Sequence, residues 1–195
     1  MPFDSVDFSV TRQLPGSDDS EYLISRNFTF FARVVRNVRR MSVAYVKVKK
    51  KKEWGIDPEM QALTQGFEAF LGELPPDLSV TFPPDGSPPW LPSTFVGNLH
   101  SYYYLTLILY NRPQLQFIDP TVNPMQWKHH MMTCYDSAKK LCRLQEAIIN
   151  HSGLEGLQNM QRGFSFTVYA GLSCICLHLV SAVAFVPFPL PRIID

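Results

Sequence analysis

The stretch Leu99–Pro113, LHSYYYLTLILYNRP, constrains the fold of this chain more than any other. Between Phe95 and Tyr110 most positions are apolar or aromatic, and only His100 can carry a charge. A helix that is apolar around its whole circumference belongs either in a protein core or in lipid. The segment is shorter than the roughly 20 residues that a membrane-spanning helix needs. A protein core is therefore the better environment for it.

Polar side chains within this stretch also favour protein over lipid. They are Asn98, His100, Ser101 and Thr106. Arg112-Pro113 is expected to end the helix, because proline lacks an amide hydrogen and pushes the preceding residue out of α geometry. We therefore predict an all-α fold, an irregular multi-helix bundle with proline-rich loops and a central apolar helix.

Helical spacing of apolar residues predicts further helices around this one, over residues 21–49, 57–74, 125–150 and 164–186. Asp57-Pro58-Glu59 is typical of a helix start, with an acidic N-cap and proline at the first helical position. Trp90, in the proline-rich loop, is expected to insert into the core. Residues 1–20 are predicted to form an extended acidic lead-in, and residues 183–195 an irregular tail of non-native sequence.

Lysines gather at the end of the first predicted helix. They are Lys47, Lys49, Lys50, Lys51 and Lys52. Cations near the C-terminal end of a helix complement its dipole, so a solvated helix end explains them. A nuclear-localisation signal or a patch for an anionic surface remains an alternative. The formal net charge of the whole chain is only +1, and nothing in it indicates a nucleic-acid partner.

No residue set predicts catalysis or a cofactor. His129, His130 and Cys134 share one predicted helix, and His130 and Cys134 are four residues apart. Two ligands without a convergent third and fourth make a poor zinc site. Cys174 and Cys176 are two residues apart and point to different sides of a helix. No nucleophile elbow, glycine-rich phosphate loop or zinc-protease motif occurs. We expect no metal in this chain and no enzymatic activity.

The tyrosines of the central helix are the candidate site for a small-molecule effector. His100, Tyr102, Tyr103 and Tyr104 place polar atoms within an otherwise apolar helix. A hydrogen-bonded core histidine is the alternative explanation for His100.

Residues 164–186 have the length and composition of a membrane anchor, because they contain no formal charge. Polar residues and a second apolar helix at Leu99 favour a bundle in which the two helices cover each other. A membrane-associated helical protein is the alternative function, although we expect no membrane partner.

Four segments together resemble the regulatory middle homology region of fungal zinc-cluster transcription factors, also called the xylanolytic-activator domain. Val6–Tyr22 is similar to its acidic stretch, and Ala62–Leu78 to a helix ending in LP, with Phe70 where tryptophan is common. Leu99–Pro113 resembles the hydrophobic helix ending in RP, and Cys134–Leu144 the helix that follows it. The matching motif positions are Phe70, Leu74, Pro75, Arg112, Pro113, Cys134 and Ala138.

The resemblance implies a regulatory domain that controls RNA polymerase II transcription in the nucleus, through intramolecular, coregulator or effector contacts, and that can form a dimer. Residues 21–182 would correspond to the later half of the family's domain. DNA and zinc binding belong to the family's six-cysteine module, whereas residues 1–40 contain no cysteine. The resemblance therefore implies no DNA or zinc binding by this chain alone.

Overall fold

The computed structural model describes residues 13, 15–16, 18–51, 57–158 and 164–185. Within these ranges the chain forms helices and no strand, which confirms the predicted all-α class. The helices are α1 (Asp19–Lys51), α2 (Pro58–Phe70), α3 (Thr94–Asn111), α4 (Gln114–Phe117), α5 (Pro124–Gln158) and α6 (Phe164–Phe185), with short 3₁₀ helices η2 (Leu71–Glu73) and η3 (Pro76–Leu78) after α2.

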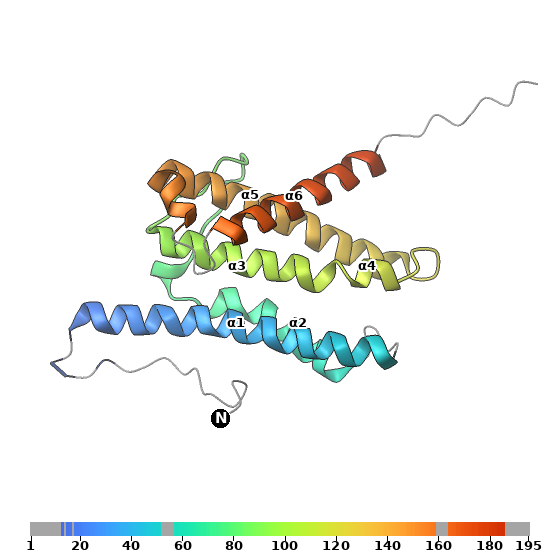
Figure 1. Ribbon diagram of the computed structural model, residues 1–195, viewed down its shortest axis with the longest axis horizontal. Helices are drawn as coiled ribbons and strands as arrows, with labels where there is room; N and C mark the ends of the chain where they lie inside the picture. The colour runs from blue at the N-terminus through green and yellow to red at the C-terminus, as the bar shows by residue number, and fades with distance from the viewer. Residues whose placement is uncertain (1–12, 14, 17, 52–56, 159–163, 186–195) are drawn as a thin grey trace, which may run out of the picture.

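The helices stack in layers on either side of α3. Figure 1 shows α1 and α2 running side by side along one side of α3, with α5 and α6 along the other. His130 Nδ1 lies 2.7 Å from Asn111 Oδ1, and Gly97 faces Ile148, so α3 and α5 are antiparallel. The short loop and α4 between them permit this hairpin of helices.

The α1–α2 pair is held by apolar packing and by ion pairs at its edge. Met41, Ala44 and Val48 of α1 share a cluster with Met60, Leu63 and Phe67 of α2. Lys47 pairs with Glu59 at 2.7 Å, Arg33 with Glu73 at 3.3 Å, and Arg26 with Asp77. Glu59 is in α2, Glu73 in η2 and Asp77 in η3, so the chain from α2 to η3 runs antiparallel to α1.

The predicted helix ends agree with the observed capping. Asp57 is the N-cap of α2, and its carboxylate accepts hydrogen bonds from the amides of Glu59 and Met60. In α3, Ser93 is the N-cap and Arg112 the C-cap, so the helix ends where the Arg-Pro pair predicts. Fourteen of the eighteen residues of α3 are buried, which accounts for its nearly continuous apolar sequence.

The prediction for Trp90 is wrong, because 79% of its surface is exposed. Its neighbours Pro89 and Leu91 are buried instead. The backbone around them has no helical structure, and in extended chain consecutive side chains point to opposite sides. The core therefore takes the two neighbours of Trp90 rather than the larger ring.

Helix α5 bends near its end and leads into α6. Gly153 has φ 63°, the left-handed region that glycine adopts at little cost, so the predicted break at residues 151–153 is a kink in this helix. Helix α6 then packs along α5, with Phe166, Ala170, Cys174 and Leu177 buried. It extends through residues 183–185, which were predicted to be irregular, and residues 186–195 lie outside the described residues. Most of the predicted lead-in, residues 1–20, also lies outside them.

Helix α6 leaves an apolar face uncovered. Val168, Leu172, Ile175 and Leu179 are all exposed. Among the described residues, no helix is both long and apolar enough to cross a bilayer.

Candidate effector pocket

A pocket of about 390 Å³ lies where α1, α3 and α6 meet. Its volume falls within the range of small-molecule sites, roughly 300–1,000 Å³. Its lining is mainly aliphatic and aromatic. The residues are Phe31, Val35 and Val38 from α1, Tyr102, Leu105, Thr106 and Leu109 from α3, and Ser165, Phe166 and Tyr169 from α6.

Aromatic rings are packed around Tyr102 at this pocket. The Tyr102 ring stacks on Phe166, with centroids 4.2 Å apart and planes inclined by 14°, and meets the edge of Phe31 at 5.0 Å. Thr106 Oγ1 donates a 2.7 Å hydrogen bond to the Tyr102 carbonyl, so this hydroxyl is used within α3. Rings and methyl groups therefore dominate what a bound molecule would meet, and the pocket suits an apolar, ring-containing ligand.

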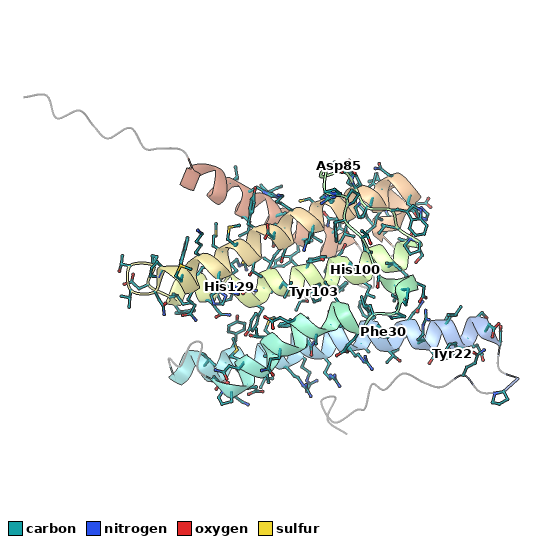
Figure 2. The ribbon with its side chains drawn as sticks, turned by 180° about the vertical axis from the view of Figure 1, so that it is seen from behind. Tyr22, Phe30, Asp85, His100, Tyr103 and His129 are labelled. Atoms are coloured by element: carbon teal, nitrogen blue, oxygen red, sulfur yellow. The ribbon has the colours of Figure 1, made fainter. Side chains whose placement is uncertain are left out.

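Of the four predicted effector contacts, only Tyr102 lines this pocket. Tyr103 points to α2 instead, where its hydroxyl donates a 2.8 Å hydrogen bond to the carbonyl oxygen of Phe67. Its ring stacks on Phe70 at 5.3 Å, and burial raises the pKa of its hydroxyl to about 12. Figure 2 shows His100 and Tyr103 along α3, inside the bundle.

Tyr104 and His100 face the loop that precedes α3. Phe82 meets the Tyr104 ring edge-on at 5.9 Å, and the Lys140 ammonium lies 5.3 Å from its centroid. His100 Nε2 donates a 2.8 Å hydrogen bond to the carbonyl of Leu78, which fixes the neutral tautomer. Burial lowers the pKa of this imidazole. These contacts match the alternative of a hydrogen-bonded core histidine.

The lysine patch is only partly described. Lys47 is half exposed and joined to Glu59, and the adjacent Glu59 carboxylate raises the pKa of its ammonium. Lys49, Lys50 and Lys51 continue α1 to its end. Lys52 lies outside the described residues. A solvated helix end and a localisation signal both remain compatible with this arrangement.

The residues weighed as metal ligands have other partners or separate positions. His130 is buried against Asn111, whereas His129 is exposed. Cys134 is fully buried beneath α3, where burial raises the pKa of its thiol to about 12. Cys174 is buried and Cys176 exposed, as their spacing predicts. Across the described ranges no three His, Cys, Asp or Glu side chains converge as metal ligands.

The positions that carry the family resemblance are mostly core contacts. Phe70 and Leu74 are buried next to α3, and Cys134 and Ala138 are buried where α5 meets its neighbours. Pro75 precedes η3 as its N-cap. Arg112 is exposed, and Pro113 is the N-cap of α4. These residues build the bundle rather than the pocket.

Sequence reasoning missed most of the pocket, since it named no residue of α1 or α6 as an effector contact. The signal that was available is the aromatic content of each contributing helix, with Phe31 on α1 and Phe166 and Tyr169 on α6. The chain matches no protein-family model, no curated protein and no solved structure in the three comparisons made with it.

Proposed function

We propose that this chain is a regulatory domain of a fungal zinc-cluster transcription factor, and that its pocket binds an apolar effector. The observation that carries the effector is the aromatic pocket on α3, built around Tyr102. The transcriptional assignment is supported by the order of the four resembling segments and by their all-α setting. In this proposal the chain acts in the nucleus through partner proteins, and it neither binds DNA nor catalyses a reaction by itself.

The pocket is suited to regulation because three helices contribute to its wall. Helices α1, α3 and α6 come from both layers of the bundle, so a ligand between them contacts all three. A ligand that binds one arrangement of these helices more tightly than another shifts the population toward that arrangement. Such a shift could change which surfaces are offered to the rest of a transcription factor.

Filling the pocket tests this function. Val35→Trp places a large ring in the pocket from α1, and Tyr102→Ala removes the ring on which Phe166 stacks. Each variant would take the place of the regulatory domain in a complete zinc-cluster factor. The output measured is that of a reporter gene under the control of this factor. We expect Val35→Trp to abolish the response to apolar candidate effectors, and Tyr102→Ala to shift its dose dependence.

Val43→Trp is the matched control, because Val43 lies on the same helix but is 43% exposed and outside the pocket. Its response should equal that of the unmodified chain. Binding of the fluorescent probe anilinonaphthalene sulfonate to the purified chains provides a second measurement, in which only Val35→Trp should lose signal. Equal reporter responses and equal probe binding in all variants would refute the effector pocket.

The nuclear assignment has its own test. Replacing Lys47 and Lys49–Lys52 with glutamine should reduce nuclear accumulation of a fluorescently tagged chain if these lysines are a localisation signal. Unchanged accumulation would leave only the solvated helix end as their explanation.

A further inference from the structure

Two cysteines and a histidine meet where α5 packs against α6, away from the pocket. Cys142 of α5 is half-buried, and the side chains that act on its thiol are Cys174 and His178 of α6. Cys174 is 1% exposed, and its Sγ lies 3.6 Å from the carbonyl oxygen of Ala138, one turn before Cys142. The register of the two helices therefore places the two cysteines next to each other, on facing sides of the α5–α6 interface.

We propose that Cys142 and Cys174 are a redox-active thiol pair that a hydroperoxide oxidises to a disulfide between α5 and α6. The proposal does not depend on the effector pocket or on a role in transcription. It assigns the attacking thiol to Cys142, which solvent can reach, and the resolving thiol to Cys174, which is enclosed.

The environment of the pair separates these two roles. The neighbouring Cys174 thiol and His178 imidazole lower the pKa of the Cys142 thiol, whereas the neighbouring Cys142 thiol and burial raise the pKa of Cys174. Thiolates rather than thiols attack peroxides, so Cys142 is the more reactive of the two. His178 in turn packs edge-on against Tyr135, with centroids 5.5 Å apart, which holds the imidazole beside the pair.

The reaction balances in two steps. The Cys142 thiolate attacks one oxygen of the hydroperoxide, the O–O bond breaks, and the departing alkoxide takes a proton to leave as an alcohol, or as water from hydrogen peroxide. Cys142 is then a sulfenic acid. The Cys174 sulfur attacks the Cys142 sulfur, an S–S bond forms, and the hydroxyl leaves as water with the Cys174 proton. Two thiols are oxidised, and one peroxide is reduced.

Peptide mapping of the purified full chain tests the pair directly. The Cys176→Ser background removes the exposed cysteine, which lies on the other side of α6 and could link two molecules. After hydrogen peroxide and alkylation of the remaining thiols, we expect a linked peptide containing Cys142 and Cys174, a mass lower by two hydrogen atoms, and full reversal by dithiothreitol. Cys134 is buried, so it should react with the alkylating reagent only after the chain has been unfolded.

Two variants distinguish the roles. In Cys174→Ala the sulfenic acid has no resolving thiol, so Cys142 should be labelled by dimedone, and the unmodified pair should not. In Cys142→Ser no intramolecular disulfide should form. Circular dichroism spectra of both variants show whether they fold. The peptide mapping of the Cys176→Ser protein tests the disulfide even if neither variant folds.

His178 is a positioning residue in this proposal, and its test is a pH profile. The ionisable groups that act on Cys142 are Cys174 and His178, with Tyr135 and Lys139 of α5 beyond the imidazole. Alkylation of Cys142 should begin at a lower pH than that of glutathione, and His178→Asn should move the profile to higher pH. Oxidation of Cys142 without a link to Cys174, or a link that persists in Cys142→Ser, would overturn the proposal.

Discussion

The hydroxyl of Tyr103 donates a 2.8 Å hydrogen bond to the main-chain carbonyl of Phe67, and this bond joins α3 to α2 in the core. Tyr110 makes an equivalent bond of 2.9 Å to the carbonyl of Met60, two turns away on the same helix. Each bond connects a tyrosine of α3 to the backbone of α2. The two layers of the bundle are thereby fixed in register as well as packed together.

Removing the Tyr103 hydroxyl should cost stability without disturbing the packing. Tyr103→Phe keeps the ring that stacks on Phe70 but loses a buried hydrogen bond, which is typically worth about 1 kcal/mol. Urea unfolding followed by circular dichroism measures the loss. Tyr169→Phe is the control, because Tyr169 is 44% exposed and its hydroxyl should contribute little. Equal midpoints for the two variants would contradict a structural role for this bond.

Two glycines should respond to alanine in opposite ways. A Cβ atom on Gly97 would lie 2.7 Å from Cγ1 of Ile148 and 2.8 Å from Cδ1 of Leu91, so Gly97→Ala should separate α3 from α5 and cost about 1–3 kcal/mol. Gly66, within α2, has no atom within 4 Å of the same position. Gly66→Ala should stabilise the chain by roughly 0.5–1 kcal/mol through higher helix propensity. Thermal unfolding of both variants measures whether each substitution raises or lowers the stability.

The free energy of unfolding should decrease as the pH is lowered from 6.5 to about 4, because of His130. Burial, and then the neighbouring His129, lower the pKa of His130 to about 4 in the folded chain, whereas the unfolded chain titrates near the ordinary value of 6.5. In this pH range the His130 imidazole is protonated in the unfolded chain but not in the folded chain, so acid favours unfolding. Above pH 6.5 the imidazole is neutral in both states, and the stability lost on acidification is fully restored. Burial lowers the pKa of His100 as well, which acts in the same direction.

The variant His130→Asn isolates this effect. Asparagine can still offer an N–H group toward Asn111 but does not titrate, so the loss of unfolding free energy on acidification should be smaller than in the unmodified chain. His151→Asn changes an exposed histidine near the other end of α5 and is the control. Denaturant midpoints at pH 7.5 and 4.5 measure both. An unchanged pH dependence in His130→Asn would exclude His130 as its source.

Arg143 fastens the proline-rich loop to α5. Its guanidinium donates to the carbonyl oxygens of Ser87 at 2.9 Å and Pro83 at 2.6 Å, and it lies 5.2 Å from the centroid of the Phe82 ring. The single ammonium of Arg143→Lys cannot reproduce this planar fork. Amide hydrogen exchange in residues 79–92 should therefore become faster. Arg112→Lys, at an exposed helix end, should leave exchange in this loop unchanged.

The sequence predicts the helices well because capping and periodicity are local properties. Asp57-Pro58 defines the start of α2, and Arg112-Pro113 the end of α3, through contacts within one turn. Trp90 shows the limit of this reasoning, since hydrophobicity alone does not decide which side of an extended loop faces the core.

The candidate site was predicted only in part for a geometric reason. Consecutive residues of a helix diverge by about 100°, so Tyr102, Tyr103 and Tyr104 cannot all face one pocket. Which of them does so depends on the placement of α1 and α6, and the sequence contains no local signal for that. The proximity of Cys174 to the turn that holds Cys142 likewise depends on how α5 and α6 pack.

The hydroxyls of Tyr103 and Tyr110 donate to main-chain carbonyls, and this determines which positions of the interface can be substituted during evolution. A carbonyl is supplied by any residue type, so positions 67 and 60 can exchange one apolar side chain for another and still accept the bond. The two tyrosines have no such freedom, because no other natural side chain carries a hydroxyl at the end of a rigid ring. Tolerance to substitution across this interface is therefore unequal, broad on α2 and narrow on α3.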